Sequence, residues 1–387
     1  MQQIEPEQLG DPKIVRAAST LATNPNAIRD LAAMLGDNLA HVFLFVSPTV
    51  DFKSIVEAAS EHISAPNIVA CSTAGEIKSG YTENQIVAVG LPASHFATGT
   101  VLVRDLNDMN KTELIGDMIR CRQAIASNEP QMENEFAFLI VDGMSLREDQ
   151  LMSMINTGLG PVPMFGGSAG DGTRFKETFV ALNGVVHTNA AVLTFVKTVC
   201  EVQTFSLDHL SPSTEKVVVT KADPNRRVVH EINAEPAARE YARILGKDPN
   251  QLSAFTFAAN PVLVRAGGRH HVRAIQRLNK NGDLIFFSAI DEGLVLTLAD
   301  AEDMESHLER ELDALSAQGD LDILLTCDCI LRRLEAAQTQ KTRNLSRVMA
   351  KHRAVGFNTY GEQFGSMHVN QTMTGVALYR PKGDVPV

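Results

Sequence analysis

The sequence lacks any run of about 18 apolar residues, the length that a membrane-spanning helix requires. Residues 1–6 (MQQIEP) also lack the charged and apolar regions of a secretory signal peptide. Cysteine is scarce, and the five present are an odd number that fits reduced thiols better than a disulfide framework. We therefore expect a cytoplasmic protein with no membrane contact.

Positive charge is scarce as well. Lys and Arg number 35 against 46 Asp and Glu, which gives a formal net charge of -11. Nucleic-acid recognition relies on clustered Lys and Arg, so this balance argues against a nucleic-acid-binding protein. What remains is an ordinary globular composition, with 44% hydrophobic and 21% charged residues, in a chain of 387 residues that is long enough for two domains.

A short motif that pairs glycine with an acid occurs three times in the sequence. Its copies are residues 71–76 (CSTAGE), 167–171 (GSAGD) and 357–362 (FNTYGE). Repetition of this kind indicates a duplicated supersecondary element.

Each copy of the motif ends a strand-helix-strand pattern. A first apolar strand is expected at residues 41–46, 136–141 and 322–326, followed by a helical stretch and a second strand that ends at the motif. The spacing of about 30 residues is what a βαβ crossover needs. A further strand is expected to close each unit, at residues 86–91, 191–196 and 374–379.

Other segments carry weaker signals. The first 35 or so residues read as helix, most clearly residues 26–35 before Gly36. In the third unit the helical region is expected to run from about 331 to 352. Between the second and third units we expect strands at 217–220, 228–229, 272–278, 284–288 and 294–298, and a helix at 236–246.

Together these patterns predict an α/β fold with mixed sheets. We expect two related lobes built from the repeated strand-helix-strand units, with helices flanking the sheets. The composition changes near residues 211–213, so we place a domain boundary there, between domains of residues 1–212 and 213–387.

The repeated motifs resemble the FIST family of sensory proteins. Residues 68–77 (IVACSTAGEI) and 165–172 (FGGSAGDG) look like the two turns of a FIST N-terminal domain. Residues 229–237 (VHEINAEPA), 272–273 (VR), 291–293 (DEG), 329–332 (CILR) and 361–375 (GEQFGSMHVNQTMTG) resemble the C-terminal half in the same order. The resemblance covers nearly the whole chain and implies a ligand-sensing protein that is not an enzyme.

The closing segment is similar to that of a haem-binding, nitric-oxide-sensing branch of the family. That resemblance implies haem b as a cofactor and nitric oxide as the ligand. It also implies output through a partner, either a sensor histidine kinase or a cyclic-di-GMP enzyme (a diguanylate cyclase or phosphodiesterase), because no output domain is recognisable in the sequence. Whether the chain forms a homodimer stays open.

His368 is the candidate axial ligand of the haem iron, since a neutral imidazole suits that role. Asn370 and Gln371, in the same segment, could orient the imidazole or face a bound diatomic molecule. The alternative is a buried, hydrogen-bonded histidine with a structural role.

The densest basic stretch contains Arg265, Arg269, His270, His271, Arg273 and Arg277. Arg273 matches the family pattern and is the candidate to bind a ligand carboxylate or a haem propionate through its guanidinium group. A solvated surface strand is the alternative.

Three further features are ambiguous. Cys327 and Cys329 follow a predicted strand and are candidates for redox-responsive or inert thiols, too few for a structural zinc site. Residues 166–170 (GGSAG) formally match a hydrolase nucleophile motif around Ser168, but no helix is expected after it. The motif acids Glu76, Asp171 and Glu362 are interpreted as structural in at least two copies.

The sequence thus leads to a haem-based nitric oxide sensor as the first functional hypothesis. The second is a haem-free receptor for an amino acid or another small carboxylate bound by Arg273.

Overall fold

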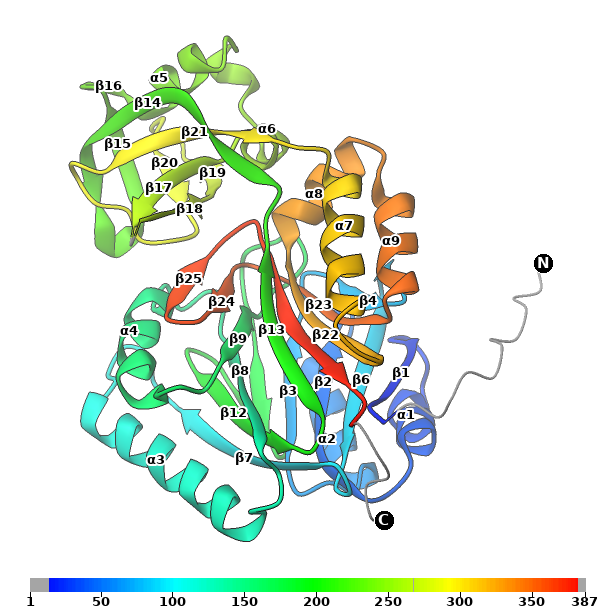
Figure 1. Ribbon diagram of the computed structural model, residues 1–387. Coiled ribbons are helices and arrows are strands. Elements are labelled where there is room, and N and C mark those ends of the chain that lie inside the picture. Colours follow the sequence, from blue (N-terminus) through cyan, green and yellow to red (C-terminus); the bar gives the residue numbers. More distant parts are fainter. Residues whose placement is uncertain (1–13, 267, 382–387) are drawn as a thin grey trace.

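The computed structural model describes residues 14–266 and 268–381 and shows a body with a smaller lobe on top of it (Figure 1). Three mixed sheets, one antiparallel sheet and the helices that flank them make up the fold, which confirms the predicted α/β class with mixed sheets. Three of the sheets have six strands each and form the body; the fourth has eight strands and forms the lobe.

The three sheets of the body share one plan, with an outer strand, a closing strand, two parallel central strands and a hairpin. The first sheet contains β1 (Arg16–Leu21), β6 (Gln85–Pro92), β2 (Leu39–Val46), β3 (Ile68–Ser72), β10 (Val180–Leu182) and β11 (Val185–His187). The second contains β7 (Phe96–Val103), β12 (Ala191–Thr198), β8 (Asn134–Val141), β9 (Met164–Ser168), β24 (Glu362–Phe364) and β25 (Met367–Val369). The third contains β13 (Glu201–Leu207), β26 (Met373–Tyr379), β22 (Leu321–Cys329), β23 (Ala354–Thr359), β4 (Glu76–Lys78) and β5 (Tyr81–Thr82).

These sheets contain the three predicted units. The pairs β2–β3, β8–β9 and β22–β23 are parallel, as a strand-helix-strand crossover requires, and the closing strands β6, β12 and β26 pair antiparallel with the first strand of each unit. All three units lie in the body and none in the lobe. The repeat in the sequence therefore corresponds to a pseudo-threefold arrangement of sheets.

Each unit gives its hairpin to a neighbouring unit. The hairpin β10–β11 follows the second copy of the motif but pairs with β3 of the first unit. In the same way, β24–β25 of the third unit extends the sheet of the second, and β4–β5 of the first unit extends the sheet of the third. The exchange is cyclic, so each unit completes its sheet with a hairpin from one neighbour and gives its own hairpin to the other.

The inner faces of the three sheets form one apolar core. Phe43 of the first unit contacts Phe138 of the second at a ring-centroid distance of 5.0 Å, and Phe45 stacks on Phe357 of the third at 4.6 Å. Helices cover the outer faces: α1 (Ala27–Leu35), α2 (Phe52–His62), α3 (Lys111–Asn128), α4 (Glu148–Leu159), α7 (Met304–Ser316), α8 (Ile330–Gln338) and α9 (Thr342–Lys351). Burial on both faces explains why the central strands read as continuous apolar runs.

The lobe is a curled sheet with its own core. Its strands, in order, are β18 (Arg269–Arg273), β17 (Val262–Ala266), β21 (Val295–Ala301), β14 (Leu210–Asp223), β15 (Val228–Ile232), β20 (Leu284–Phe286) and β19 (Ile275–Leu278), with β16 (Glu235–Pro236) beside β15. Helices α5 (Ala237–Ile244) and α6 (Ala254–Ala259) pack on it, and short 3-10 turns lie at Pro224–Arg226 and Pro249–Gln251. The predicted boundary at residue 212 falls inside β14, which carries the chain from the body into the lobe.

Two helix predictions differ from the structure. Residues Arg16–Leu21, expected to be helical, form strand β1, because pairing with the closing strand β6 satisfies their backbone groups. Residues 1–13 of that prediction lie outside the described part. The single long helix of the third unit is instead α8 and α9, separated at Gln340, whose φ of 59° is incompatible with a continuous helix.

The three motif copies meet at the centre of the body and hydrogen-bond to one another. The bonds run from Ala74 N to Asn358 O (2.9 Å), Asn358 N to Gly75 O (2.7 Å), Gly170 N to Ser72 O (3.0 Å), Gly172 N to Thr73 O (3.1 Å), Ser168 N to Gly361 O (2.8 Å) and Tyr360 N to Ser168 O (3.1 Å). We call this set of contacts the turn ring. It joins every unit to both of the others through backbone groups alone.

The motif acids stabilise the turn ring. Glu76 and Glu362 each accept a hydrogen bond from the threonine three residues earlier and from a backbone N–H near the start of the closing strand. Asp171 accepts from the backbone N–H groups of Phe175, Lys176 and Glu177. Burial raises the pKa of Glu76 to about 7 and that of Glu362 to about 8, against the opposing effect of these hydrogen bonds.

The turn ring predicts that Gly170 cannot be replaced. A methyl group on Gly170 would lie 2.7 Å from the backbone nitrogen of Ala74 and 2.8 Å from its Cβ, a contact that no side-chain rotation can relieve. We expect Gly170→Ala to lower the free energy of unfolding by roughly 1–3 kcal/mol, measured by urea denaturation. The matched control is Gly116→Ala on α3, where the nearest atoms belong to the flexible side chain of Arg120. Equal unfolding free energies in both variants would contradict the importance of the ring.

A second prediction concerns pH. The pKa of Glu362 in the folded protein is about 8, above its ordinary value of 4.5, so the folded state binds a proton that the unfolded state releases. Stability from this group is therefore greatest below the unfolded pKa and falls as the pH rises toward the folded pKa. Glu362→Gln has an uncharged side chain of the same shape as protonated Glu362. The urea concentration at its unfolding midpoint should therefore fall less between pH 5 and pH 8 than that of the unchanged protein. Midpoints that fall equally with pH in both proteins would refute the raised pKa of Glu362.

Candidate functional site

A cluster of polar and charged side chains lies where the lobe meets the body. The hairpin β24–β25 extends toward the lobe, and β25 lies against both α4 of the body and β18 of the lobe (Figure 1). These three elements bring together Glu148 and Asp149, His368 and Asn370, and Arg273. We call this cluster the junction site.

His368 lies on β25 with 2% of its surface exposed. Its Nδ1 is 3.2 Å from Nε2 of Gln363, whose other hydrogen reaches the hydroxyl oxygen of Ser168 at 3.1 Å. With the amide placed this way, Gln363 donates to Nδ1, and the imidazole proton resides on Nε2. Burial lowers the pKa of His368, so the ring is neutral at physiological pH.

Two buried donors converge beside Gly361. Nε2 of His368 and Nδ2 of Asn370 have no hydrogen-bond partner among the described residues. A methyl group on Gly361 would lie 2.9 Å from the former and 3.0 Å from the latter, so both atoms face the same side of this glycine. Oδ1 of Asn370 accepts a hydrogen bond from Ser288 of the lobe. The third copy of the motif thus leaves room for two donor groups.

An ionic cluster connects the lobe with α4. Arg227 donates to Glu148 at 2.6 Å and to the carbonyl of Phe287, and its distance to Asp149 is 3.4 Å. The backbone N–H of Ala289 also donates to Asp149, at 3.1 Å. Burial alone would raise the pKa of Asp149, but His368, Arg227 and Arg273 together hold it below its ordinary value. Asp149 is therefore ionised, and both carboxylates pair with Arg227.

Arg273 ends strand β18 and faces this cluster. Nη1 donates to the carbonyl of Val272 at 3.3 Å, whereas Nε is buried with no partner among the described residues. Burial lowers the pKa of Arg273, and Asp149 opposes that effect. Unlike Arg227, the guanidinium of Arg273 makes no hydrogen bond to a carboxylate within the described part of the chain.

The basic stretch predicted from the sequence is divided by the structure. Arg265, His270 and Arg277 are exposed, and Arg265 faces His270 across the hairpin β17–β18. Arg273 interacts electrostatically with Asp149 and His368. The side chain of Arg269 lies outside the described part.

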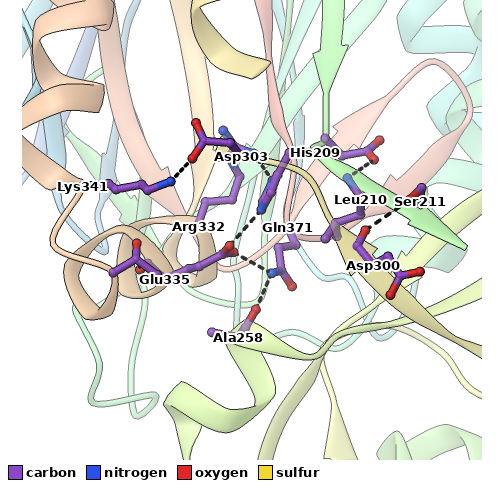
Figure 2. Close-up of polar contacts among 12 residues, drawn as sticks. His209, Leu210, Ser211, Ala258, Asp300, Asp303, Arg332, Glu335, Lys341 and Gln371 are labelled. Carbon is purple, nitrogen blue, oxygen red and sulfur yellow. Dashed lines mark hydrogen bonds and ion pairs between the residues drawn. The ribbon is translucent and has the colours of Figure 1, made fainter. Parts of the chain in front are cut away.

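Gln371 belongs to a neighbouring network. Its Nε2 donates to the carbonyl of Ala258 at 2.5 Å and to Glu335 at 3.3 Å, and Glu335 contacts His209 at 2.9 Å (Figure 2). His209 in turn lies 3.1 Å from Arg332, which is fully buried and pairs with Asp328 at 2.8 Å. This network ties the lobe to α8 and lies beside the junction site.

Cys327 and Cys329 flank Asp328 at the end of β22, and the backbone of Cys329 donates to the carbonyl of Thr372 at 3.1 Å. Both are free thiols with no exposed surface, Cys327 in the central core and Cys329 in the apolar contact between lobe and body. Burial raises the pKa of both thiols well above the ordinary value. That environment favours unreactive thiols, because the thiolate is the reactive form.

Ser168 lacks the context of a catalytic nucleophile. It ends β9 with no exposed surface, and an irregular turn follows it where the nucleophile motif requires a helix. Its hydroxyl oxygen accepts a hydrogen bond from Gln363, so Ser168 helps to orient His368.

Sequence reasoning missed several members of the junction site. Glu148, Asp149, Arg227, Ser288 and Gln363 were not identified, since they lie far apart in the chain and only the packing of lobe on body unites them. One signal was available: Gln363 directly follows the third copy of the motif, in the segment that carries the family resemblance.

Haem fits this site poorly. An iron ligand needs an unprotonated ring nitrogen with open space in front of it, but Nε2 of His368 is buried beside Gly361 and Asn370. The surrounding side chains of Glu148, Asp149 and Arg227 are charged, whereas a porphyrin face needs apolar walls.

Within residues 14–266 and 268–381, no group of three or more His, Cys, Asp or Glu side chains is placed to hold a metal ion. No helix in these segments is sufficiently long and apolar to cross a membrane.

Comparison with known proteins identifies the family. The FIST N domain matches residues 40–235, and the FIST C domain matches residues 237–365. No curated protein matches the chain. Among solved structures, a chorismatase is similar over 94% of this chain and 98% of its own, at 10% identity and a TM-score of 0.35, a level that supports no functional argument. The two domain matches, which together span most of the sequence, show that the chain belongs to the FIST family.

Proposed function

We propose that this protein is a receptor for an amino acid or another small carboxylate, bound at the junction site. FIST domains are sensory, ligand-binding domains, not catalytic ones. The observation that carries the proposal is the set of three buried polar atoms without partners in the described structure: Nε of Arg273, Nε2 of His368 and Nδ2 of Asn370. Buried polar groups are nearly always hydrogen-bonded, so unpaired ones clustered at a junction indicate a ligand site.

The chemistry of these groups selects the ligand. With the Gln363 amide placed so that it donates to Nδ1 of His368, all three atoms carry hydrogen and can only donate, so the ligand must supply acceptors. A carboxylate matches the planar guanidinium of Arg273 and can take two hydrogen bonds from it. Arg227 already pairs with Glu148, which leaves Arg273 to the ligand. A zwitterion keeps the charge balanced, since its ammonium group can face Asp149.

The position of the site suggests how binding is sensed. Arg273 belongs to the lobe, and His368 and Asn370 belong to the body, so a ligand held by all three favours one arrangement of the two parts. A ligand shifts a conformational equilibrium only through unequal affinity for its states. We infer that the lobe orientation is the signal. A sensor histidine kinase or a cyclic-di-GMP enzyme remains the predicted reader of that signal.

Arg273 provides the test. A thermal-shift screen of the twenty amino acids and short carboxylic acids should identify compounds that stabilise the protein, because a ligand at 100 times its Kd stabilises by about 2.7 kcal/mol. Arg273→Ala should weaken binding of the best compound at least tenfold in calorimetry. Arg277→Ala is the matched control, as Arg277 is exposed nearby and should leave the affinity unchanged. An equal loss of ligand affinity in both variants, or no loss of affinity in either, would refute the proposal.

A haem-based nitric oxide sensor is the second candidate. One observation favours it: His368 is a buried, neutral imidazole whose Nε2 has no partner among the described residues. Rotation of the Gln363 amide would move the imidazole proton to Nδ1 and free Nε2 for a metal. The enclosed and charged surroundings of His368 argue against this candidate.

A visible spectrum of the purified protein supplied with haem separates the two candidates. The haem-based sensor should show a Soret band that shifts on addition of nitric oxide and is lost in His368→Ala without a change in far-ultraviolet circular dichroism. We expect no such band, given the closed site. A histidine-dependent band would reverse the order of the two proposals.

A further inference from the structure

A crevice of about 280 Å³ lies on the body, away from the junction site. It is bounded by α8 of the third unit, by the loop after β2 and by the first copy of the motif. Ile330, Leu334 and Ala337 supply an apolar wall, and the hydroxyl-bearing residues Thr49 and Thr173 line it as well. Its volume lies just below the range for drug-sized ligands, which begins at about 300 Å³, and so suits a molecule of few heavy atoms.

Arg333 is the charged group of this crevice. It projects from α8, and its side chain is only 12% exposed. Nη1 donates to Oδ1 of Asn358 at 2.8 Å, and Nη2 donates to Glu83 at 2.8 Å. The guanidinium also lies over the ring of Tyr81, 5.5 Å from its centroid. These contacts fix a largely buried cation at the wall of the cavity.

Glu83 differs from Arg333 in exposure. Its side chain is 73% exposed, on the turn between β5 and β6. Such a carboxylate gains little from an ion pair, because water solvates it well and ordering the side chain costs entropy. The guanidinium, in contrast, needs an acceptor at this position. A carboxylate from a ligand in the crevice could therefore replace that of Glu83.

The first copy of the motif makes room for Arg333. A methyl group on Gly75 would overlap Nη1 of Arg333, so only glycine admits the guanidinium at this point. Gly361 in the third copy does the same for His368 at the junction site. Two copies of one turn thus leave space for a polar side chain at two different cavities.

We propose that the crevice beside Arg333 is a second binding site, which takes a small monocarboxylate with a short apolar body. Arg333 binds the carboxylate and α8 contacts the apolar part, while Glu83 occupies the place of the carboxylate when no ligand is bound. The other acid that lines the crevice, Glu76, is committed to Thr73 and to the N–H of Gln85. The proposal does not depend on the function of the junction site.

Calorimetric titration with butyrate tests the site, with butyramide as the neutral analogue of the same shape. Glu83→Ala should bind butyrate at least tenfold more tightly than the unchanged protein, because the internal competitor is gone. Butyramide should bind neither form. Adding Arg333→Lys to Glu83→Ala should abolish the gain in butyrate affinity. Adding Arg273→Ala to Glu83→Ala should leave that gain intact, which distinguishes this site from the junction site.

Three outcomes would overturn the proposal: no butyrate binding in Glu83→Ala, equal affinity of the two protein forms, or binding of butyramide as tight as that of butyrate. Circular dichroism checks that each variant is folded. Should Arg333→Lys unfold the protein, the comparison of Glu83→Ala with the unchanged protein still decides the matter, because Glu83 is exposed and its loss leaves the core intact.

Discussion

The turn ring is the constraint on which the rest of the structure depends. Three copies of one turn bond to each other through backbone groups, and each copy is followed by a hairpin that enters a neighbouring sheet. Because these hydrogen bonds join backbone groups, most side-chain substitutions in the turns leave their geometry unchanged. Gly170 is different, since an added Cβ there would collide with Ala74 of the turn ring. The pseudo-threefold body follows from this centre, since no unit completes its sheet alone.

The same turns also determine where ligand chemistry is found. Each copy lies at the carboxyl ends of parallel strands, the usual position of binding crevices in α/β proteins. The third copy positions His368 through Gly361, and the first positions Arg333 through Gly75. In the second copy, Asp171 accepts the hydroxyl of Tyr360, which links that turn to the third copy. One backbone geometry thus supports different side chains, and the side chains decide the chemistry.

The lobe covers the junction site and contributes charged and polar side chains to it. It covers the hairpin β24–β25 and brings Arg227, Arg273 and Ser288 to residues of the body. Ionic contacts and the apolar cluster that contains Tyr360 and Phe287 hold the two parts together. The crevice beside Arg333 lacks such a cover and is lined by the body alone. A closed polar site and an open one therefore occur in a single chain.

The sequence by itself determined the repeated units, the strands that form them and the family, because apolar runs and glycine-acid turns are local signals. It also singled out His368, Asn370 and Arg273, which the structure brings together. Tertiary structure alone decided the cyclic exchange of hairpins, the strand at Arg16–Leu21 and the partners Glu148, Arg227 and Gln363. The physical reason is that these features rest on contacts between residues distant in the chain. No local pattern encodes whether a buried imidazole faces open space or a neighbouring backbone.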